Sequence, residues 1–311
     1  MILINVIVAF ENISDIKKLL EYILLQERNC SPIVCIDNSI TNFQVIQQLC
    51  QQFAIKNKAK VYYLRNFKNE GSAKGFALGM QKAYELGAEW IWLHDQDGYP
   101  QKECLSSLIH LIDKENILAP SVIGEDSERI KVFSGRVDEN DNWVPIEISG
   151  NKTEADIAGT AGLFINKEVI NKIGVYDYSH YFVGMEDFDY CMRAKKSGFK
   201  LKIINNAYYF HPNKWNVKQW KIKGRIKYFG EFSENETRIY GGHIYYKIIH
   251  SNDLFFLSFF YSLCKIALKY VSGRDINLKK TFSIYFSGLY YRYTRNKKIT
   301  INISNLNWTS Y

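Results

Sequence analysis

Several patterns that mark common protein classes are absent from this chain of 311 residues. Its six cysteines are scattered and none forms a C-x-x-C pair, so the usual spacing of a zinc site is missing. No run of about 18 uncharged apolar residues occurs, and we therefore expect no transmembrane helix. The chain opens on apolar residues without a basic leader or a small-residue cleavage site, which predicts a buried strand rather than a signal peptide. Scattered cysteines without a signal peptide favour a reducing, cytoplasmic compartment.

Acidic residues are scarce in the last third of the chain. Residues 212–311 hold 17 Lys and Arg against 5 Asp and Glu, whereas residues 1–211 hold 23 against 27. This asymmetry favours an anionic partner for the last third. The apolar segment Leu254–Cys264 lies within it and is too short to span a bilayer. The segment predicts either contact with anionic lipid at the membrane interface or packing in a core or a homo-oligomer interface. No nucleic-acid motif accompanies the charge, so we expect no nucleic-acid partner.

The chain has enough apolar material for a large core, because 47% of its residues are hydrophobic and 15% are aromatic. Strand-like and helix-like runs alternate over residues 2–123, and Ser14 is the expected N-cap of the first helix. Such alternation requires crossover connections and predicts an α/β fold with a mostly parallel, Rossmann-like sheet and helices on both faces. Strands are expected at 2–10, 31–37, 60–64, 90–94 and 117–123, and helices at 14–26, 41–56, 71–87 and 102–116.

The pattern changes after residue 124. Six further elements are expected: a hairpin around 139–142, a glycine-punctuated strand at 156–165, a helix at 166–173, a loop that leads into a helix over 184–198, and strands at 199–204 and 298–302. Beyond residue 212 the pattern is otherwise helical and basic. We therefore divide the chain into a first domain, residues 1–212, and a basic, mainly helical C-terminal region, residues 213–311.

Polar side chains directly follow the expected strands of the first domain. In open α/β sheets, ligands bind beside the carboxyl ends of the strands. The side chains at those positions are the first candidates for a binding site: Glu11, Asp37, Asn38, Arg65, Asn66, Asp95, Gln96 and Asp97.

The sequence Asp95-Gln96-Asp97 is the sharpest local signal. Two carboxylates one residue apart at a strand end can share a divalent cation through their oxygens. Such a cation would clamp a diphosphate. A solvated acidic turn is the alternative that the motif alone leaves open. An EF-hand loop is excluded, because its twelfth position is Ser106 rather than glutamate.

A second acidic group, Glu186, Asp187 and Asp189, stands at the start of an expected helix. A carboxylate in a cleft can act as a general base towards an attacking hydroxyl. Alternatively, acids in a first helical turn complement the helix dipole, and Asp189 can pair with Arg193 one turn later. The spacing alone does not separate these two interpretations.

Two further features gain meaning only together with the acidic groups. The turn Asn69–Gly75 opens a helix whose N-terminal N–H groups favour anions, but it has neither the dinucleotide nor the Walker glycine spacing. His211 follows an aromatic strand and would serve as a metal ligand only if the fold brought it beside Asp97. An ordinary helix start and a structural histidine are the alternatives.

The order of these motifs resembles that of the GT-A glycosyltransferases of family 2, over roughly residues 4–212. Six features carry the resemblance: the strand and polar turn Ile4–Asn12, the acidic Asp37, the run Asn69–Gly75, Asp95-Gln96-Asp97, Gly159-Thr160-Ala161-Gly162, and Glu186-Asp187 before a helix with Arg193. Within the family, Asp-Gln-Asp followed by proline is similar to bacterial rhamnosyltransferases, although Gly98 replaces the serine often found there. His211 is similar to the metal-binding histidine of galactofuranosyl- and rhamnosyltransferases.

The resemblance implies an inverting, metal-dependent transfer of a sugar from a nucleotide-sugar donor to an acceptor hydroxyl. Asp187 would be the base, with Glu186 or Asp189 orienting the acceptor. The resemblance also implies nucleotide contacts for Ala9, Glu11, Asp37, Asn38, Asn66, Asn69, Gly71, Asp95 and Gln96, Mn²⁺ or Mg²⁺ contacts for Asp95, Asp97 and His211, and acceptor contacts for Gly159, Thr160 and Arg193.

Rhamnose from a dTDP donor is the favoured sugar, with galactofuranose, galactose or glucose from dTDP or UDP left open. The acceptor would be a saccharide or a polyprenyl-linked saccharide in surface polysaccharide synthesis, which would bring the protein to the inner face of the cell membrane. Two alternatives come from other classes. One is a phosphohydrolase with a D-x-D-G motif, whose first aspartate is a nucleophile, and the other is a scaffold that binds a nucleotide-sugar without catalysis.

Overall fold

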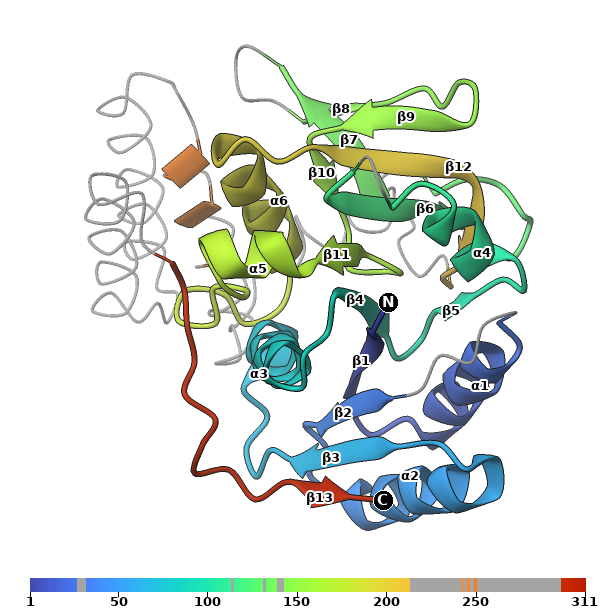
Figure 1. Cartoon of the computed structure of the whole chain (residues 1–311), viewed down its shortest axis with the longest axis vertical. Coiled ribbons are helices and arrows are strands. Elements are labelled where there is room, and N and C mark those ends of the chain that lie inside the picture. The colour runs from blue at the N-terminus through green and yellow to red at the C-terminus, as the bar shows by residue number, and fades with distance from the viewer. Residues whose placement is uncertain are drawn as a thin grey trace, which may run out of the picture.

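The computed structural model describes residues 1–26, 32–112, 115–130, 133–138, 143–212 and 298–311, together with Gly242, Tyr245, Tyr246, Ile249 and His250. The expectations about Leu254–Cys264 and about the turn at 139–142 lie outside these residues. The predicted alternation is confirmed (Figure 1) by β1 (Leu3–Ala9), α1 (Ile13–Leu24), β2 (Ile33–Asp37), α2 (Phe43–Asn57), β3 (Val61–Arg65), α3 (Gly71–Glu85), β4 (Trp90–Asp95), β5 (Tyr99–Pro100), α4 (Cys104–Ile109) and β6 (Ile117–Ile123).

The second half of the first domain adds mainly strands. They are β7 (Ser134–Val137), β8 (Trp143–Pro145), β9 (Lys152–Ala155), β10 (Ile157–Ala158), β11 (Phe164–Asn166) and β12 (Leu201–Phe210), with the helices α5 (Lys167–Ile173) and α6 (Glu186–Lys196) and, near the end of the chain, β13 (Thr309–Ser310). Antiparallel pairing of β7 with β8 confirms the expected hairpin, and both belong to a small sheet of order β10-β7-β8.

One mixed sheet of ten strands, counted over the described residues, forms the centre of the fold. Its order is β13-β3-β2-β1-β4-β11-β6-β12-β5, and β9 pairs with β12 off this path. The strands β3, β2, β1 and β4 are mutually parallel, as predicted, and β6 is parallel to β12. The strand β11 runs antiparallel to both β4 and β6, which joins the two parallel groups.

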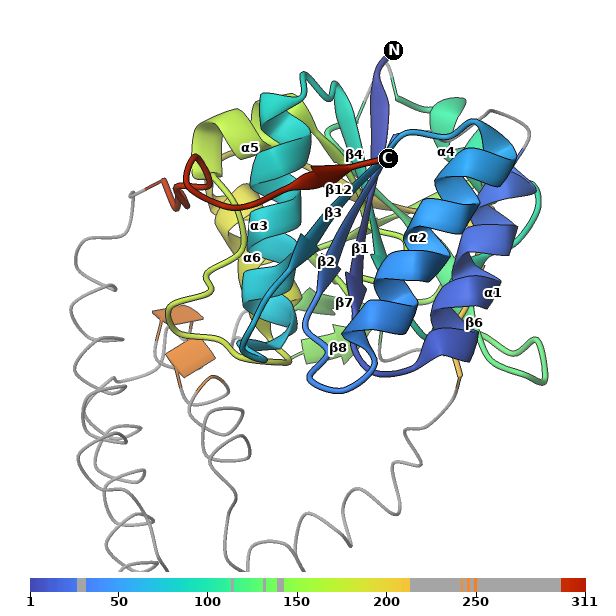
Figure 2. The same cartoon turned by 90° about the horizontal axis from the view of Figure 1, so that it is seen from below.

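Helices cover both faces of this sheet, and its central strands are therefore buried from both sides. All seven residues of β1 are buried. Successive side chains of a strand point to opposite faces, so Val6 and Val8 join the core cluster that includes α3, while Ile7 and Ala9 join the cluster that includes α1 and α2. Figure 2 shows α1 and α2 on one side of the strands and α3, α5 and α6 on the other.

The helix α3 lies unusually close to β1. A Cβ atom added at Gly75 would come within 2.7 Å of the Val8 side chain, and one added at Gly79 would come within 2.3 Å of Val6. Two glycines one helical turn apart therefore let the helix rest directly on the strand. This contact fixes the N-terminus of α3 at the carboxyl edge of the sheet.

Four predicted details are wrong, each because of a local contact that the pattern does not show. The N-cap of α1 is Asn12, whose Oδ1 accepts from the Asp15 N–H at 3.3 Å and from the Ser14 hydroxyl. The helix α4 ends at Ile109, well before residue 116. The expected strand at 156–165 is split into β10 and β11, and the one at 298–302 forms only a single bridge between Ile299 and Gly174.

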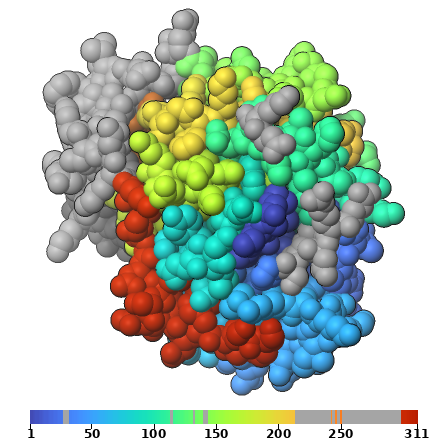
Figure 3. Space-filling model, in the orientation of Figure 1, coloured from blue at the N-terminus to red at the C-terminus, as the bar shows by residue number. Residues whose placement is uncertain are grey.

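Residues 298–311 run back along the first domain. Ile301 and Ile303 are buried in the same core cluster as β1 and α3. The strand β13 then pairs antiparallel with β3, at the edge of the sheet. Figure 3 shows this tail in red as a band that starts beside the yellow-green atoms and runs past the cyan atoms to the blue atoms at the lower end of the view. Within the described part of the chain, no helix is long and apolar enough to cross a bilayer.

Candidate active site

The carboxyl ends of β1, β2, β3 and β4 meet at one edge of the sheet. The register aligns Ala9 with Asp37 and Asp37 with Arg65, and it pairs Val8 with Asp95. The residues that follow these strands therefore lie side by side. This arrangement is the one that the sequence predicts for a binding edge.

Glu11 shapes the loop between β2 and α2. Its backbone has a positive φ of 58°, and its N–H donates to Ser39 Oγ at 2.7 Å. Its carboxylate accepts from the N–H groups of Ile40, Thr41 and Asn42 and from the Thr41 hydroxyl, over 2.6–3.0 Å. The hydrogen bond from the Thr41 side chain is the main cause that lowers the pKa of Glu11 to about 2. The carboxylate of Glu11 is therefore committed to the loop backbone.

Asp37 is buried, and both of its carboxylate oxygens are in use. Oδ1 accepts from the Ser39 N–H at 2.8 Å, and Oδ2 accepts from the Tyr63 hydroxyl at 2.7 Å. Burial raises the pKa of Asp37, while these two hydrogen bonds oppose the rise. In this arrangement Asp37 supports the same loop as Glu11, and its contact with a nucleotide stays a prediction.

A chain of amide hydrogen bonds ties the strand-end loops to the start of α3. Asn66 Nδ2 donates to Asn38 Oδ1 at 2.9 Å, Asn38 Nδ2 donates to the Gly71 carbonyl at 3.0 Å, and the Gly71 N–H donates to Asn69 Oδ1 at 3.0 Å. Gly71 has a φ of +87°, and a Cβ there would lie 2.0 Å from the carbonyl oxygen of Phe182. Glycine is therefore required at this position.

The acidic turn after β4 is held against the end of β1. Gln96 Oε1 accepts from the Phe10 N–H at 2.6 Å. Burial raises the pKa of Asp95 to about 7, where the nearby His211 opposes the rise and the charges of Asp97 and Asp187 add to it. Asp95 thus shares one electrostatic environment with residues from β4, β12 and α6.

The fold brings Asp97 and His211 together, as the metal-ligand interpretation required. His211 Nε2 lies 3.2 Å from Asp97 Oδ1, and His211 Nδ1 donates to the Pro212 carbonyl at 3.1 Å. Burial lowers the pKa of His211, but the hydrogen bond to Asp97 and the charges of Asp95 and Asp97 outweigh it and raise the pKa overall.

Gly98 is what allows this close approach. A Cβ at Gly98 would lie 2.5 Å from the Tyr209 ring and 3.3 Å from Cδ2 of His211. Tyr209 is fully buried, so its ring has no room to retreat. The glycine that departs from the rhamnosyltransferase pattern is therefore explained by packing at this point of the chain.

Asp97 and His211 are suited to a cation whose remaining coordination positions a diphosphate would fill. Among the described residues, no group of three or more His, Cys, Asp or Glu side chains could hold a metal ion on its own. The 3.2 Å between the oxygen and the nitrogen is close to the roughly 3 Å that separates neighbouring ligands of an octahedral ion with ligands at about 2.1 Å. Mg²⁺ is typically bound by one or two carboxylates together with substrate phosphates. Two protein ligands therefore suit an open site better than a closed structural one.

Asp187 is held in place by two backbone N–H groups. Oδ2 accepts from the Thr160 N–H at 3.1 Å, and Oδ1 accepts from the Phe188 N–H at 2.8 Å. Burial raises the pKa of Asp187 to about 6 against the opposing effect of these hydrogen bonds. The Thr160 hydroxyl pairs with the Tyr176 hydroxyl at 3.1 Å. The segment with Gly159 and Thr160, expected at the acceptor, thus holds the expected base.

Glu186 lies beside Asp187 and is only 4% exposed. One of its oxygens accepts from the Ser72 hydroxyl at 2.5 Å, and the other has no hydrogen-bond partner among the described residues. Burial and then the charge of Asp187 raise the pKa of Glu186 to about 8. Ser72 was not among the predicted site residues, although its place in the first turn of α3 could have pointed to it.

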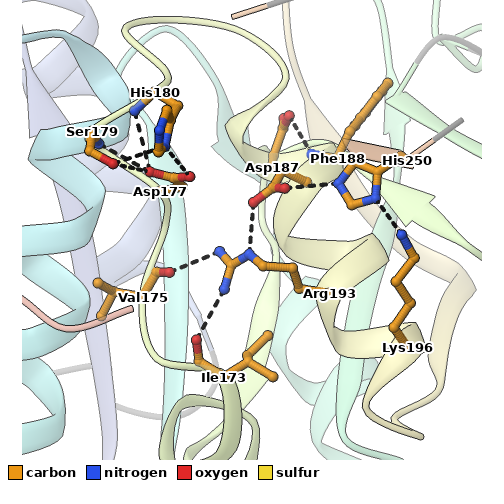
Figure 4. Close-up of polar contacts among 11 residues, drawn as sticks. Ile173, Val175, Asp177, Ser179, His180, Asp187, Phe188, Arg193, Lys196 and His250 are labelled. Atoms are coloured by element: carbon orange, nitrogen blue, oxygen red, sulfur yellow. Dashed lines mark hydrogen bonds and ion pairs between the residues drawn. The ribbon is translucent and has the colours of Figure 1, made fainter. Parts of the chain in front are cut away.

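Asp189 and Arg193 belong to a separate, buried network (Figure 4). Asp189 Oδ2 accepts from Arg193 Nε at 2.7 Å, and Asp189 Oδ1 accepts from His250 Nε2 at 2.8 Å. Arg193 also donates to the carbonyls of Ile173 and Val175. The predicted i,i+4 pair is confirmed, and it occupies the groups that were expected to meet the acceptor. The geometry therefore favours a structural role for both residues.

These features define a class before any comparison is made. A mixed sheet that carries an Asp-x-Asp turn after β4 and an acidic pair on α6 is the arrangement of GT-A glycosyltransferases. Residues 5–172 match the model of the family described as glycosyl transferase family 2, and the chain belongs to this family. That assignment sets aside the phosphohydrolase alternative.

Two curated relatives and two solved structures illustrate the likeness. Galactofuranosyltransferase GlfT1 of Mycolicibacterium smegmatis is 27% identical over 203 residues, 62% of this chain and 65% of the relative. The protein of the same name from Mycobacterium tuberculosis is 26% identical over 214 residues, 67% of this chain and 69% of the relative. The chain thus spans about two thirds of the length of these relatives.

The structures share the fold at low identity. The crystal structure of GalNAc-T7 with UDP, GalNAc and Mn²⁺ superposes with a TM-score of 0.57 at 17% identity, over 81% of this chain and 52% of that chain. The crystal structure of S. aureus TarS 1-349 in complex with UDP superposes with a TM-score of 0.50 at 13% identity, over 83% of this chain and 68% of that chain.

Proposed function

We propose that this protein is an inverting, divalent-cation-dependent glycosyltransferase that moves a sugar from a nucleotide-sugar to an acceptor hydroxyl. The observation that carries the proposal is the convergence of Asp97 and His211 with Asp187 at one edge of the sheet. The charge of Asp187 acts on Asp95, and that of Asp95 acts on Glu186, which supports the view that these groups face one site. Carboxylates with perturbed pKa values at strand ends are typical of catalytic sites.

Asp97 and His211 would hold Mn²⁺ or Mg²⁺, with Asp95 beside them. The ion, when bound, supplies positive charge that stabilises the diphosphate leaving group. The hydrogen bond from Nδ1 to Pro212 favours the tautomer whose Nε2 faces Asp97 with a lone pair. A cation and a proton would compete for that position, in keeping with the raised pKa of His211.

The nucleotide would lie along the strand ends. Ala9, Asn38, Asn66, Asn69 and Gly71 are the candidates for direct contact with it, because they lie on the edge that the parallel strands share. Three other candidates act on the loops themselves through the hydrogen bonds described above: Glu11, Asp37 and Gln96. Their substitution would disturb the shape of the site rather than remove a single contact.

Asp187 would take the proton of the acceptor hydroxyl. As that proton leaves, the hydroxyl oxygen bonds to the anomeric carbon, and the bond from this carbon to the diphosphate oxygen breaks. A pKa of about 6 keeps Asp187 ionised at neutral pH, and proton removal of this kind is worth roughly 10²–10⁴-fold. Glu186 would orient the acceptor through the carboxyl oxygen that Ser72 does not engage.

Galactofuranose is the sugar we favour first, because the curated relatives are galactofuranosyltransferases. Rhamnose from dTDP is the second candidate, since Asp95-Gln96-Asp97 is followed by Pro100. A saccharide or polyprenyl-linked saccharide is the proposed acceptor, with membrane contact through the basic C-terminal region.

A thermal-shift panel tests the proposal first. It combines UDP, dTDP and the corresponding galactofuranose and rhamnose donors with Mn²⁺, Mg²⁺ or chelator. We expect one nucleotide family to stabilise the protein only with metal, and Asp97→Ala to lose that stabilisation. Binding followed by no sugar transfer to any saccharide acceptor would support a scaffold instead. Stabilisation by no nucleotide under any metal would refute both.

A further inference from the structure

Residues beyond 212 pack against the loop that leads to the acidic pair. The Tyr245 ring stacks on His180 with centroids 4.0 Å apart and planes 5° apart, and it meets Tyr181 edge-on at 5.4 Å. Tyr245 and Ile249 form a buried cluster with Tyr181 and Ala73. The loop is thus covered by side chains that the sequence analysis assigned to a separate C-terminal region.

The other side of the same loop rests on the start of α3. The Phe182 carbonyl accepts from the Ala73 N–H at 3.2 Å and faces Gly71. The loop ends at Met185, which has a positive φ of 75° and directly precedes the first residue of α6, Glu186. The backbone that leads to the acidic pair therefore lies between α3 on one side and Gly242, Tyr245 and Ile249 on the other.

His250 attaches to α6 itself at two points (Figure 4). Its Nε2 donates to Asp189 Oδ1 at 2.8 Å, and its Nδ1 accepts from Lys196 Nζ at 2.9 Å. The ammonium group of Lys196 thereby fixes the tautomer, because it leaves the ring proton on Nε2. Asp189 and Lys196 are seven residues apart, two turns along one face of the helix. The imidazole of His250 therefore contacts α6 at two positions that are two helical turns apart.

Arg193 alone does not fix the Asp189 carboxylate. Arg193 links Asp189 Oδ2 to the backbone carbonyls of Ile173 and Val175, while His250 links Asp189 Oδ1 to the C-terminal region. With one of these partners removed, the carboxylate can pivot about the remaining hydrogen bond. Asp189 lies two residues after Asp187 in the same first turn of α6, so the contacts that hold Asp189 also help to hold the turn that carries Glu186 and Asp187.

We propose that His250 is a positioning residue for Glu186 and Asp187, acting through Asp189 and the body of α6. This inference rests on the proposed function, because it assigns His250 to the geometry of the catalytic pair. A displacement of about 1 Å at a reacting group can cost about 10²-fold in rate without any loss of binding. In the proposed function, the donor nucleotide and its cation would be held by the strand-end loops and by the residues that follow β4 and β12, whereas the hydrogen bonds of His250 go to Asp189 and Lys196 on α6.

The experiment compares four variants of the full chain. In His250→Phe the ring stays and both hydrogen bonds are lost, whereas in His250→Gln an amide can replace them. In Lys196→Met the group that fixes the tautomer is removed. Lys195→Met is the matched control, because Lys195 is the adjacent exposed lysine and its ion-pair partner is Asp156, at 2.8 Å. The measurements are kcat and donor KM from nucleotide release, the affinity for Mn²⁺ with UDP or dTDP, and the melting temperature.

We expect His250→Phe to lower kcat by about tenfold or more while donor KM and nucleotide affinity change by no more than about twofold. His250→Gln should recover most of kcat, Lys196→Met should fall between the two, and Lys195→Met should match the wild type. Unchanged kcat in His250→Phe and Lys196→Met would overturn the inference, as would a parallel loss of nucleotide affinity. If His250→Phe fails to fold, Lys196→Met against Lys195→Met decides. A wild-type chain without turnover would refute the proposed function instead, so the two failures are distinguishable.

Discussion

Asp187→Asn tests the base assignment, and the structure shows that this change is not a simple removal of charge. Both oxygens of Asp187 accept from backbone N–H groups, those of Thr160 and Phe188. An asparagine has one acceptor oxygen, so its NH₂ group must face one of these N–H donors. A buried donor left unsatisfied costs about 1–3 kcal/mol.

An opposing effect limits this loss of stability. The asparagine has no charge, so it also removes the burial cost of the Asp187 carboxylate and its repulsion of Glu186 and Asp95. Against a typical total stability of about 5–15 kcal/mol, the variant should remain folded. No opposing effect offsets the loss of turnover, because the amide of asparagine cannot take the proton of the acceptor hydroxyl. We therefore expect kcat to fall by roughly 10²–10⁴-fold.

The assay is nucleotide release at saturating donor, paired with calorimetric binding of Mn²⁺ and the nucleotide product. Nucleotide affinity should stay within about threefold of the wild type, because Asp187 is assigned to the acceptor side. Circular dichroism at the assay temperature controls for unfolding. Loss of nucleotide affinity in step with kcat would move Asp187 into the donor or cation site. A kcat close to that of the wild type would refute its role as base.

Two further predictions concern the loops that build the site. Gly71→Ala should destabilise the protein by more than Gly87→Ala, measured by urea unfolding, because both glycines have positive φ but only a Cβ at Gly71 meets backbone, at Phe182; equal losses would contradict the clash. Glu11→Gln should lower the melting temperature at neutral pH. The gap to the wild type should close as pH falls from 4.5 towards 2, because the pKa of Glu11 is lowered in the native state and its contribution is lost over that range. A gap that does not depend on pH would refute the charge-based account.

The first four strands could be predicted because burial on both faces leaves no other pattern for them. Strands such as β1 are apolar apart from single residues such as Asn5, and the glycines and polar residues between the strands mark the turns. The break between β10 and β11 could not be predicted in this way. It coincides with Gly162, whose φ is +79° and where an added Cβ would lie 2.7 Å from the side chains of Pro120 and Tyr209. Those contacts come from β6 and β12, which are distant in sequence, so the run 156–165 has the pattern of one strand.

The candidate site also has a part that the sequence predicts and a part that it does not. Sequence order placed one acidic group at a strand end and the other at the start of a helix, and the structure brings Asp97 and His211 together as expected. A pattern does not show how many hydrogen bonds a carboxylate already makes, so Asp37 and Asp189 resembled ligand-binding groups although their oxygens are engaged within the protein. His250 had no signal at all, because its partner Asp189 lies 61 residues away in the chain.

The same burial that shapes the site should make the protein less stable as pH rises. In the native state, burial raises the pKa of Glu186 to about 8 and that of Asp95 to about 7, from their ordinary values of 4.5 and 3.8. Native molecules therefore bind more protons than unfolded ones above about pH 4, and stability falls as pH rises through the native pKa values. His211, whose pKa is also raised, contributes in the same direction. The lowered pKa values of His94 and His250 oppose this trend only below the ordinary histidine value of 6.5.

The window from about pH 6.5 to about pH 8 therefore reports mainly on the acidic cluster together with His211, because Glu186 still gives up its proton there in the native state. We expect the free energy of unfolding, measured by urea titration in chelator, to decrease across this window. Glu186→Gln should flatten the decrease, because the glutamine stays neutral at every pH and can still accept from Ser72. Adding Mn²⁺ with the cognate nucleotide at the upper end of the window should restore stability in the wild type, since a cation binds best when Asp97 is ionised and His211 is neutral. A free energy that is constant or rises with pH would mean that the carboxylates are well solvated in solution, and it would remove the electrostatic basis for placing Asp95, Glu186 and Asp187 in one buried site.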